Sequence, residues 1–433
     1  MSDGEEIMRE KKDLSSEWEG IPMWKVFILG LGFGTTALVW TLYNVAIPVF
    51  LADNYHIKEG LIGFVMTLDN IIGFFLQPYV GAKSDKTWTR IGRRMPYIIT
   101  GTVLGAIFFS IVPLAASYAT FWVFLAVIIA LNLSMAIYRS PVVSLMPDLV
   151  PSKKRSLANG IINLMGGASA ALSLFVSARL FKEGKVNEAF WVSSALMITM
   201  LVILLIFIRE PQMPLEIPEI EEATFVQLKN EFTYSLRSKD KSLVFMLFAI
   251  GSWFIAWNAV EAFFSLYVWR HIMPYATKEE ALAAASKALF PFPIVFVLAT
   301  LPGGYLGTKI GRLLTMKIGL VIFGIALTGI IFTTNLKIIT YLLIVAGIGW
   351  GFVNVNSIVV VWEHASNNGI GTGLYYAFSS FAAITGPTLV GIIIELFGRN
   401  YGLLFPFSIT FVLIAFIFLL NVKSGEAGDK YKK

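Results

Sequence analysis

Twelve long apolar segments decide what this chain can fold into. Each is close to or longer than the roughly 20 residues that a helix needs to cross a bilayer. Backbone N–H and C=O groups find no water in lipid, so such segments have to be helical. A chain of 433 residues with 56% hydrophobic and only 14% charged residues is not an ordinary soluble protein. The sequence predicts an all-α, polytopic membrane protein with spans near 26–50, 59–81, 96–115, 119–146, 157–178, 188–208, 242–268, 288–307, 318–335, 338–362, 370–396 and 401–421.

The distribution of Lys and Arg predicts the orientation of these spans. Both termini and every second loop carry 24 of the 34 Lys and Arg residues, the other loops carry 9, and Arg139 alone lies within a span. Positively charged loops are retained in the cytoplasm, so we expect both termini inside and a multi-pass protein of the cell membrane. These loops also explain the net charge of +6, and no nucleic-acid-binding module is visible.

The longest inside connection predicts the division of the chain. It separates an N-terminal six-helix half at 1–208 from a C-terminal half at 242–433, with a central loop at 209–241. Within this loop an amphipathic stretch at 223–236 is expected to lie as a helix on the bilayer surface.

The sequence contains no pattern typical of catalysis, metal binding or nucleotide binding. It has no cysteine, and His56, His271 and His364 are far apart. No Lys-Ser or Lys-Thr follows its glycine-rich stretches, as a phosphate-binding loop requires. The first 20 residues lack the apolar core of a secretory signal, so we expect a cytoplasmic tail. We therefore expect no enzyme, no catalytic residue, no metal and no cofactor.

A dense basic loop at 81–96 joins the second and third spans. It reads Gly-Ala-Lys-Ser-Asp-Lys-Thr-Trp-Thr-Arg-Ile-Gly-Arg-Arg-Met-Pro, and its glycines and final proline favour a tight turn. The spacing Gly-x3-Asp followed by Arg-x-Gly-Arg-Arg resembles the loop between helices two and three of the major facilitator superfamily. The longer form, Ser-Asp-x4-Arg-x-Gly-Arg-Arg-x-Pro, is most similar to the sucrose/proton symporter and glycoside–cation symporter branch. A generic basic loop would explain the charge but not the ordered Asp, Gly and Pro.

The resemblance implies a cytoplasmic gate at this loop. Pro-Asp-x6-Arg at 147–155 is similar to the acid-x6-Arg motif of sugar-transporting members and adds two residues to the gate. We expect Asp85 to cap the start of the eleventh helix when the inner side is closed, because the N–H groups of a helix start attract an acid. The predicted gate residues are Gly81, Asp85, Arg90, Gly92, Arg93, Arg94, Asp148 and Arg155.

The two halves repeat parts of this pattern. Arg-Ile-Gly-Arg at 90–93 recurs as Lys-Ile-Gly-Arg at 309–312, and an acid lies near the end of the fourth span of each half, Asp148 and Glu363. The second copy is degraded, since Thr308 stands in place of Asp85. Transporters are commonly built from repeated halves with the substrate between them. The resemblance thus implies a twelve-helix transporter in which one half rocks against the other.

Three charged residues within spans need a reason to be there, because a charge at mid-membrane costs a few kcal/mol or more. We expect Asp69, and as a second choice Glu261, to carry a coupling proton. Arg139 offers a permanent fork of donors for an oxygen-rich or anionic substrate group. Sucrose symporters have an arginine in this helix one turn further on, where Val143 stands here. A purely structural hydrogen bond or salt bridge remains the alternative for all three residues.

Amides and aromatic rings within the spans suggest the class of substrate. Amides offer donors and acceptors to hydroxyl groups, and aromatic faces stack on sugar C–H faces, although most single aromatic residues serve packing. The resulting prediction is a monomeric sugar or glycoside transporter that uses a proton and alternating access, with an exporter or a lipid flippase or scramblase as the alternative. The predicted substrate residues besides Arg139 are Asn44, Asn70, Asn163, Trp257, Asn258, Asn354, Asn356, Tyr375 and Tyr376.

Overall fold

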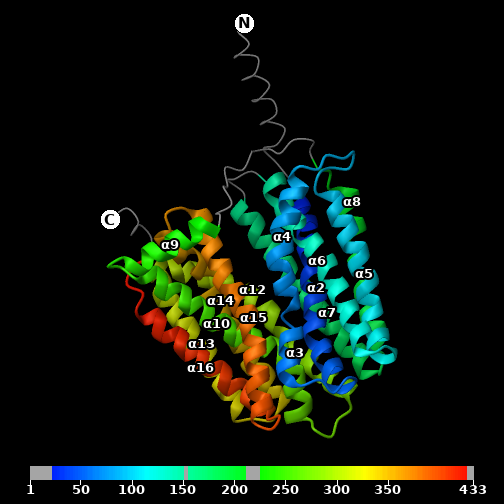
Figure 1. Ribbon diagram of the computed structural model, residues 1–433. Helices are drawn as coiled ribbons and strands as arrows, with labels where there is room; N and C mark the ends of the chain where they lie inside the picture. Colours follow the sequence, from blue (N-terminus) through cyan, green and yellow to red (C-terminus); the bar gives the residue numbers. More distant parts are fainter. Residues whose placement is uncertain (1–21, 151–154, 211–224, 427–433) are drawn as a thin grey trace.

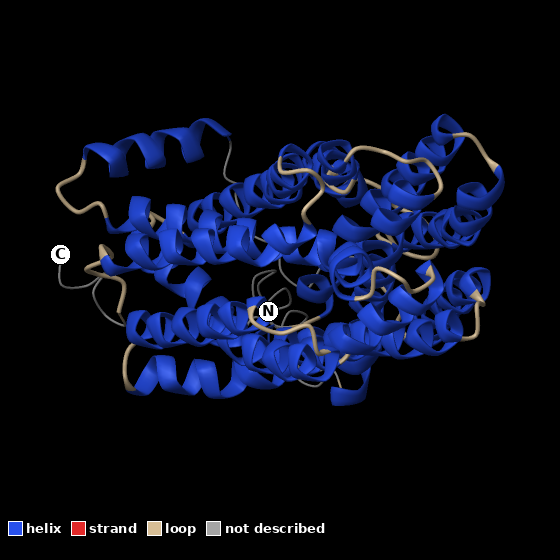
Figure 2. Cartoon of the chain, turned by 90° about the horizontal axis from the view of Figure 1, so that it is seen from below, coloured by secondary structure: helices blue, strands red, loops and turns tan. Residues whose placement is uncertain are grey.

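The computed structural model describes residues 22–150, 155–210 and 225–426, and every regular element in these ranges is a helix (Figures 1 and 2). Twelve of the helical segments are long and apolar enough to cross a membrane. The predicted all-α class and the predicted number of spans are therefore confirmed.

Two bundles of helices lie side by side (Figure 1). The N-terminal bundle consists of α2 (Met23–Asp53), α3 (Glu59–Val65), α4 (Leu68–Asp85), α5 (Met95–Tyr118), α6 (Phe121–Leu149), α7 (Arg155–Lys182) and α8 (Val186–Phe207). The C-terminal bundle consists of α10 (Ser242–Tyr267), η2 (Val268–Ile272), α11 (Lys278–Leu289), α12 (Pro291–Lys309), α13 (Arg312–Ile331), α14 (Leu336–His364), α15 (Asn368–Leu396), η3 (Tyr401–Leu403) and α16 (Leu404–Leu420).

Three spans differ from the sequence-based prediction. The second span is broken, because α3 ends at Val65 and α4 begins at Leu68. The eighth span begins ten residues earlier than expected, at Lys278, since a Thr277–Glu280 capping box starts α11 and its charged residues lower the hydropathy. The ninth begins at Arg312 rather than near 318, because Lys317 interrupts the apolar pattern without interrupting the helix.

The central loop contains the predicted helix, α9 (Phe225–Arg237), and this helix contacts α15 of the C-terminal bundle. Leu228 lies so close to Gly373 of α15 that an added Cβ there would be 2.8 Å from the Leu228 Cδ2 atom. The rings of Phe232 and Phe378 of α15 are 5.6 Å apart. Part of this apolar face therefore packs on the C-terminal bundle, and the expected position of α9 on the bilayer surface stays a prediction.

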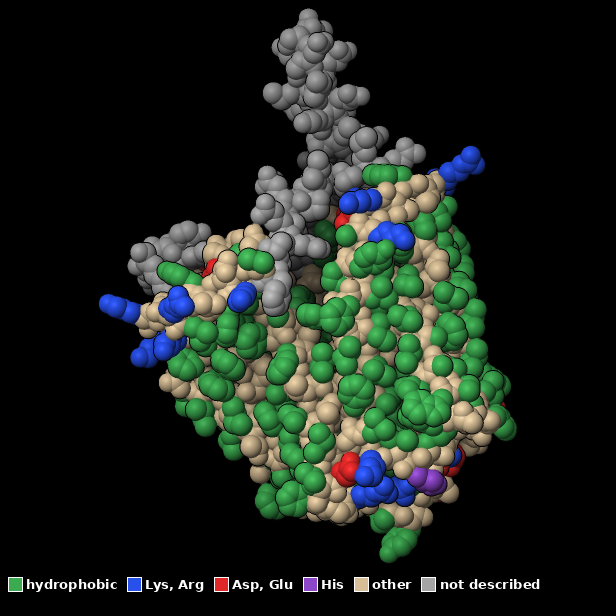
Figure 3. All heavy atoms as spheres, viewed as in Figure 1, with side chains coloured by type: hydrophobic (Ala, Val, Ile, Leu, Met, Phe, Trp, Pro, Cys, Tyr) green, Lys and Arg blue, Asp and Glu red, His purple; other side chains and the backbone are tan. Residues whose placement is uncertain are grey.

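The surface carries an apolar band between two charged ends, as expected for a membrane-spanning protein (Figure 3). We call the end that bears residues 86–94 the basic face and the other end the opposite face. The bundles meet at the opposite face, where α3 packs against α15 and α7 against α11, and their ribbons diverge toward the basic face (Figure 1). In this conformation the molecule is closed at the opposite face.

Candidate transport site

The break in the second span positions Asp69. Met66 and Thr67 separate α3 from α4, and Asp69 lies in the first turn of α4, where free backbone N–H groups and the helix dipole favour a negative charge. The Asn70 amide donates to the Asp69 carboxylate at 2.8 Å. Helices broken at mid-membrane are a common way to build an ion or substrate site in transporters.

Charges from three helices act on one another around Asp69. Arg139 of α6 and Glu261 of α10 both interact electrostatically with Asp69, with opposite signs. Arg139 and Asp69 form no direct ion pair in the part of the chain that the structure describes. The Asn44 amide of α2 donates to Glu261 at 2.9 Å, which links the two bundles. The structure thus brings Asp69, Arg139, Glu261 and Asn44 together where the bundles face each other.

Two buried polar side chains near Asp69 were not predicted. Tyr43 of α2 is completely buried and interacts electrostatically with Asp69. It also adjoins the buried Asn132 of α6. Neither residue is charged, so the search for charges within spans gave no signal for them.

Aromatic rings form a cluster beside Glu261 in the C-terminal bundle. Trp257 lies one helical turn before Glu261 on α10 and stacks on Phe292 of α12, with the ring centroids 4.1 Å apart and the planes at 11°. Trp350 of α14 lies 5.4 Å from Trp257. Tyr375 of α15 lies close to Ser357, with 3.3 Å between their hydroxyl oxygens. Flat apolar faces therefore adjoin the charged group.

The remaining predicted substrate residues are in different surroundings. Asn356 is buried and donates to Gly303 O at 3.1 Å, which joins α14 to α12. Asn258 and Asn354 donate to carbonyl groups of their own helices. Asn163 and Tyr376 are exposed. A substrate role for these five residues stays a prediction, and for Asn356 the structure offers a helix-packing role as well.

The predicted gate residues form a tight network on the basic face of the N-terminal bundle. Arg93 reaches Asp148 with 2.6 Å between Nη2 and Oδ1, and Arg94 Nε donates to the other carboxylate oxygen at 3.0 Å. Arg94 also pairs with Asp85 and donates to Ser84 at 2.6 Å. Arg94 therefore ties the end of α4 to the end of α6.

The other predicted gate residues take different positions. The close packing of α4 on α6 requires Gly81, since an added Cβ would be 2.6 Å from the Ser140 hydroxyl. Arg90 is exposed, and the side chain of Arg155 lies outside the described residues. The eleventh helix α15 is capped by its own Asn367 in this conformation, so the predicted capping by Asp85 belongs to a different conformation and stays a prediction.

The C-terminal bundle keeps the turn of this network, as expected, and also part of its ion pairing, although Thr308 stands in place of Asp85. Arg312 donates to Glu363 at 2.9 Å, as Arg94 does to Asp148 at 3.0 Å. Gly92 and Gly311 have φ values of 113° and 102°, which favour glycine.

One part of this repeat was missed. Glu210 accepts from the backbone N–H groups of Arg94 and Met95 at the start of α5, and Glu426 does the same for Arg312 and Leu313 at the start of α13. Each acid lies more than 100 residues after the helix that it caps, and so no short motif reveals it.

A ring of polar contacts on the opposite face was also missed. Buried Glu59 accepts from Tyr401 at 2.8 Å and pairs with Arg399 at 3.2 Å. Lys58 and Glu395 are 3.5 Å apart, and Lys278 pairs with Asp53 at 3.0 Å. Each contact joins the N-terminal bundle to the C-terminal bundle, which suits a gate between them. Lys, Arg, Asp and Glu in short loops look like ordinary solvated charges in the sequence.

Comparison with known proteins decides the family. The Major Facilitator Superfamily model matches residues 29–295 and 272–432. The chain belongs to the Major Facilitator Superfamily. It is therefore a multi-pass membrane transporter rather than an enzyme, as the basic loop predicted.

Individual relatives are distant. The isoprimeverose transporter of Lactiplantibacillus pentosus is 22% identical over 388 residues, which cover 86% of this chain and 79% of that protein. An uncharacterized symporter of Synechocystis is 27% identical over 139 residues, which cover 29% of this chain and 26% of that protein.

Solved structures show the same fold. The nucleoside transporter NupG matches with a TM-score of 0.68 at 17% identity and covers 92% of this chain and 99% of that one. A bacterial homologue of the human lysosomal transporter Spinster, in an inward-facing and occupied conformation, matches with a TM-score of 0.68 at 15% identity and covers 92% and 96%.

Proposed function

We propose that this transporter carries a sugar or glycoside together with a proton, by alternating access between its two bundles. The observation that carries the proposal is the group of Asp69, Arg139 and Glu261, which meet at the interface between the bundles next to the aromatic face of Trp257. Carboxylates and a guanidinium suit sugar hydroxyl groups, and Trp257 suits a sugar ring. Similarity to an isoprimeverose transporter supports this substrate class.

The same group suggests how proton and substrate are coupled. A nearby guanidinium stabilises an ionised carboxylate. When a substrate draws Arg139 toward its own oxygens, Asp69 loses this stabilisation and takes up a proton. Breaking the Asn44–Glu261 hydrogen bond then removes one link between the bundles. Substrate and proton would thus be loaded together before the bundles rock.

Transport by the purified protein in proteoliposomes tests this proposal. We expect counterflow of at least one member of a panel of disaccharides and glycosides, and accumulation of that sugar when a pH gradient is imposed. The panel includes nucleosides, because NupG shares the fold. Uptake of nucleosides alone would contradict the substrate class, and accumulation driven by sodium without a pH gradient would contradict proton coupling. Movement of a fluorescent phospholipid but of no solute would favour the flippase alternative.

We also propose that the basic face is cytoplasmic and that both termini lie there in the cell membrane. The chain has no cysteine, so single cysteines can be placed freely. Lys86 and Ser117 are exposed at opposite ends of the molecule, whereas Ser84 is buried and unsuitable. An impermeant maleimide added to intact cells should label Ser117→Cys and not Lys86→Cys. The reverse pattern would overturn the orientation.

A further inference from the structure

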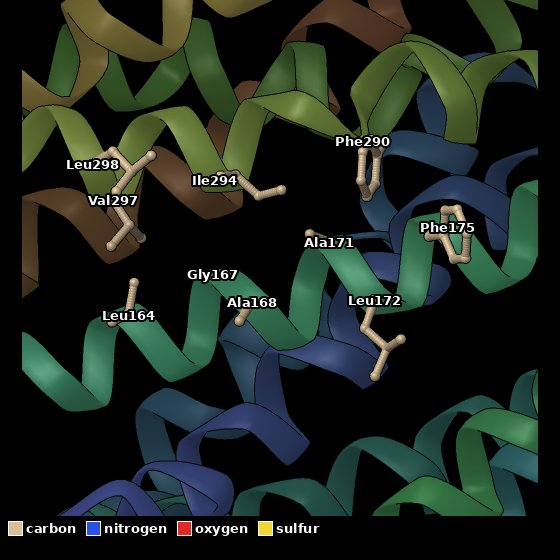
Figure 4. Close-up of a pocket in the computed structure, with 10 residues that line it drawn as sticks. All are labelled: Leu164, Gly167, Ala168, Ala171, Leu172, Phe175, Phe290, Ile294, Val297 and Leu298. Carbon is tan, nitrogen blue, oxygen red and sulfur yellow. The ribbon is translucent and has the colours of Figure 1, made fainter.

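An apolar groove separates the two bundles along their lipid-facing side. It lies between α7 and α12, encloses a cavity of about 470 Å³, and is lined only by apolar residues, such as Leu164, Ala168 and Leu172 on one wall and Ile294 and Leu298 on the other (Figure 4). The groove is distinct from the charged site around Asp69, since it contains no polar side chain.

The position of the groove decides what can fill it. Leu172, Phe175 and Leu298 on its walls are 39%, 41% and 54% exposed, and they lie in spans, so they face hydrocarbon rather than water. A buried water needs two to four polar partners, which these walls do not offer. An empty groove would leave the wall atoms without dispersion contacts. A lipid chain is the occupant that the bilayer supplies.

A cation lies at the end of the groove nearer the opposite face. The Arg179 guanidinium lies 4.2 Å from the centre of the Phe175 ring, which is itself part of the groove. The hydroxyl groups of Ser177 of α7 and Ser286 of α11 are 3.4 Å apart, so α7 and α11 are in contact at this level. No carboxylate of the described residues pairs with Arg179. A phosphate group would complement the charge of Arg179.

We propose that this groove binds a phospholipid of the leaflet at the opposite face, with one acyl chain between α7 and α12 and its phosphate at Arg179. The acyl chain gains no hydrophobic energy, since it is already in hydrocarbon. The preference for a phospholipid at this groove over other lipid-facing surfaces therefore comes from filling the groove and from pairing the phosphate with Arg179. The attraction between one basic side chain and an anionic headgroup near a membrane surface changes the occupancy of such a lipid site roughly fivefold.

Photo-crosslinking of the full-length protein in nanodiscs tests this site. The probe is phosphatidylglycerol with a diazirine in the middle of one acyl chain, and adducts are mapped by peptide mass spectrometry. We expect adducts to concentrate on residues 164–175 and 294–298 rather than on α8. Ala168→Phe, at an exposed position of the groove, should remove them, whereas Val202→Phe on the lipid-facing side of α8 should not.

The contribution of the headgroup is measured separately. Arg179→Gln should lower labelling by phosphatidylglycerol roughly fivefold. Labelling by a diacylglycerol with the same diazirine chain should not change. Arg270→Gln is the matched control, because Arg270 also stacks on an aromatic ring, that of Trp269, outside the groove.

Three results would overturn the proposal. They are adducts spread evenly over all lipid-facing helices, unchanged labelling of Ala168→Phe, and unchanged phosphatidylglycerol labelling of Arg179→Gln. If Ala168→Phe does not fold, Leu172→Trp fills the groove from its exposed rim and gives the same test.

Discussion

At the scale of single residues, position rather than identity distinguishes the two intramembrane acids. Asp69 lies at a helix start beside Asn70 and interacts with Arg139 within its own bundle. Glu261 instead accepts from Asn44 of the other bundle and adjoins the ring of Trp257. We therefore propose that Asp69 exchanges the coupling proton and that Glu261 responds to substrate and to bundle closure.

The two acids should consequently differ in a transport assay. Asp69→Asn should abolish accumulation driven by a pH gradient and leave exchange of substrate across the membrane, because the rocking step itself needs no proton carrier there. Glu261→Gln keeps a side chain that Asn44 can bond, so it should mainly raise the KM for substrate. Proteoliposome uptake and counterflow separate these effects. Accumulation that remains pH-driven in both variants would show that neither acid carries the proton.

At the scale of elements, an acid that is distant in the sequence caps the third span of each bundle, α5 and α13. Glu210 caps α5, and Glu426 caps α13, just after a glycine of positive φ. An added Cβ at Gly92 would collide with Glu210, and one at Gly311 would be 2.9 Å from a Glu426 oxygen. Glycine is thus needed at both positions for its backbone angle and for the room that the capping acid takes.

Removing either cap should weaken the fold. We expect Glu210→Ala and Glu426→Ala each to cost about 1–2 kcal/mol, the range for a lost N-terminal cap. Thermal unfolding in detergent should show a lower melting temperature for both. Glu279→Ala is the control, because this acid lies in the first turn of α11 and caps no other helix. Equal melting temperatures for the wild type and both cap variants would contradict a stabilising role.

The pH dependence of the melting temperature should reveal the raised pKa of Glu210. Burial raises the pKa of its carboxyl, and the backbone N–H groups of Arg94 and Met95 partly oppose this shift. Because the folded pKa lies above the unfolded one, the part of the stability that this shift contributes is present below the usual glutamate value of about 4.3 and is lost as pH rises through the folded pKa. The melting temperature of the wild type should therefore fall more in this window than that of Glu210→Gln. Parallel curves would argue against this assignment.

At the scale of the whole molecule, the sequence was informative about membrane spans and weak about contacts between them. The length of the apolar segments predicts twelve spans, and the basic loop predicts the family. Both signals lie within short stretches of sequence, because the bilayer acts on each segment and each loop separately. The break before Asp69 has no proline or glycine to mark it, since Met66 and Thr67 stand there. The pairing of Glu59 with Arg399 joins the start of α3 to a loop more than 300 residues later, and such pairs depend on the tertiary fold.

Closure at the opposite face depends on backbone contact as well as on ion pairs. Gly63 of α3 lies against Pro387 of α15, where an added Cβ would overlap the Pro387 carbonyl oxygen and lie 2.9 Å from Thr388 Cα. Gly391 of α15 lies equally close to Glu59. A methyl group at Gly63 meets backbone atoms, so no side chain can rotate away to accommodate it, and the two helices have to separate.

Gly63→Ala should therefore shift the transporter away from the described conformation without removing any polar group. An overpacked contact costs about 1–3 kcal/mol, enough to change the ratio of two conformations fivefold or more. Spin labels at Tyr118→Cys and Tyr275→Cys report the opposite face, and labels at Lys86→Cys and Thr308→Cys report the basic face. We expect longer distances in the first pair and shorter ones in the second. Gly166→Ala is the control and should match the wild type, because a Cβ added there would meet nothing within 4 Å apart from its own stretch of helix backbone. Distances in Gly63→Ala that equal those of the control would mean that the contact between α3 and α15 does not hold this face closed.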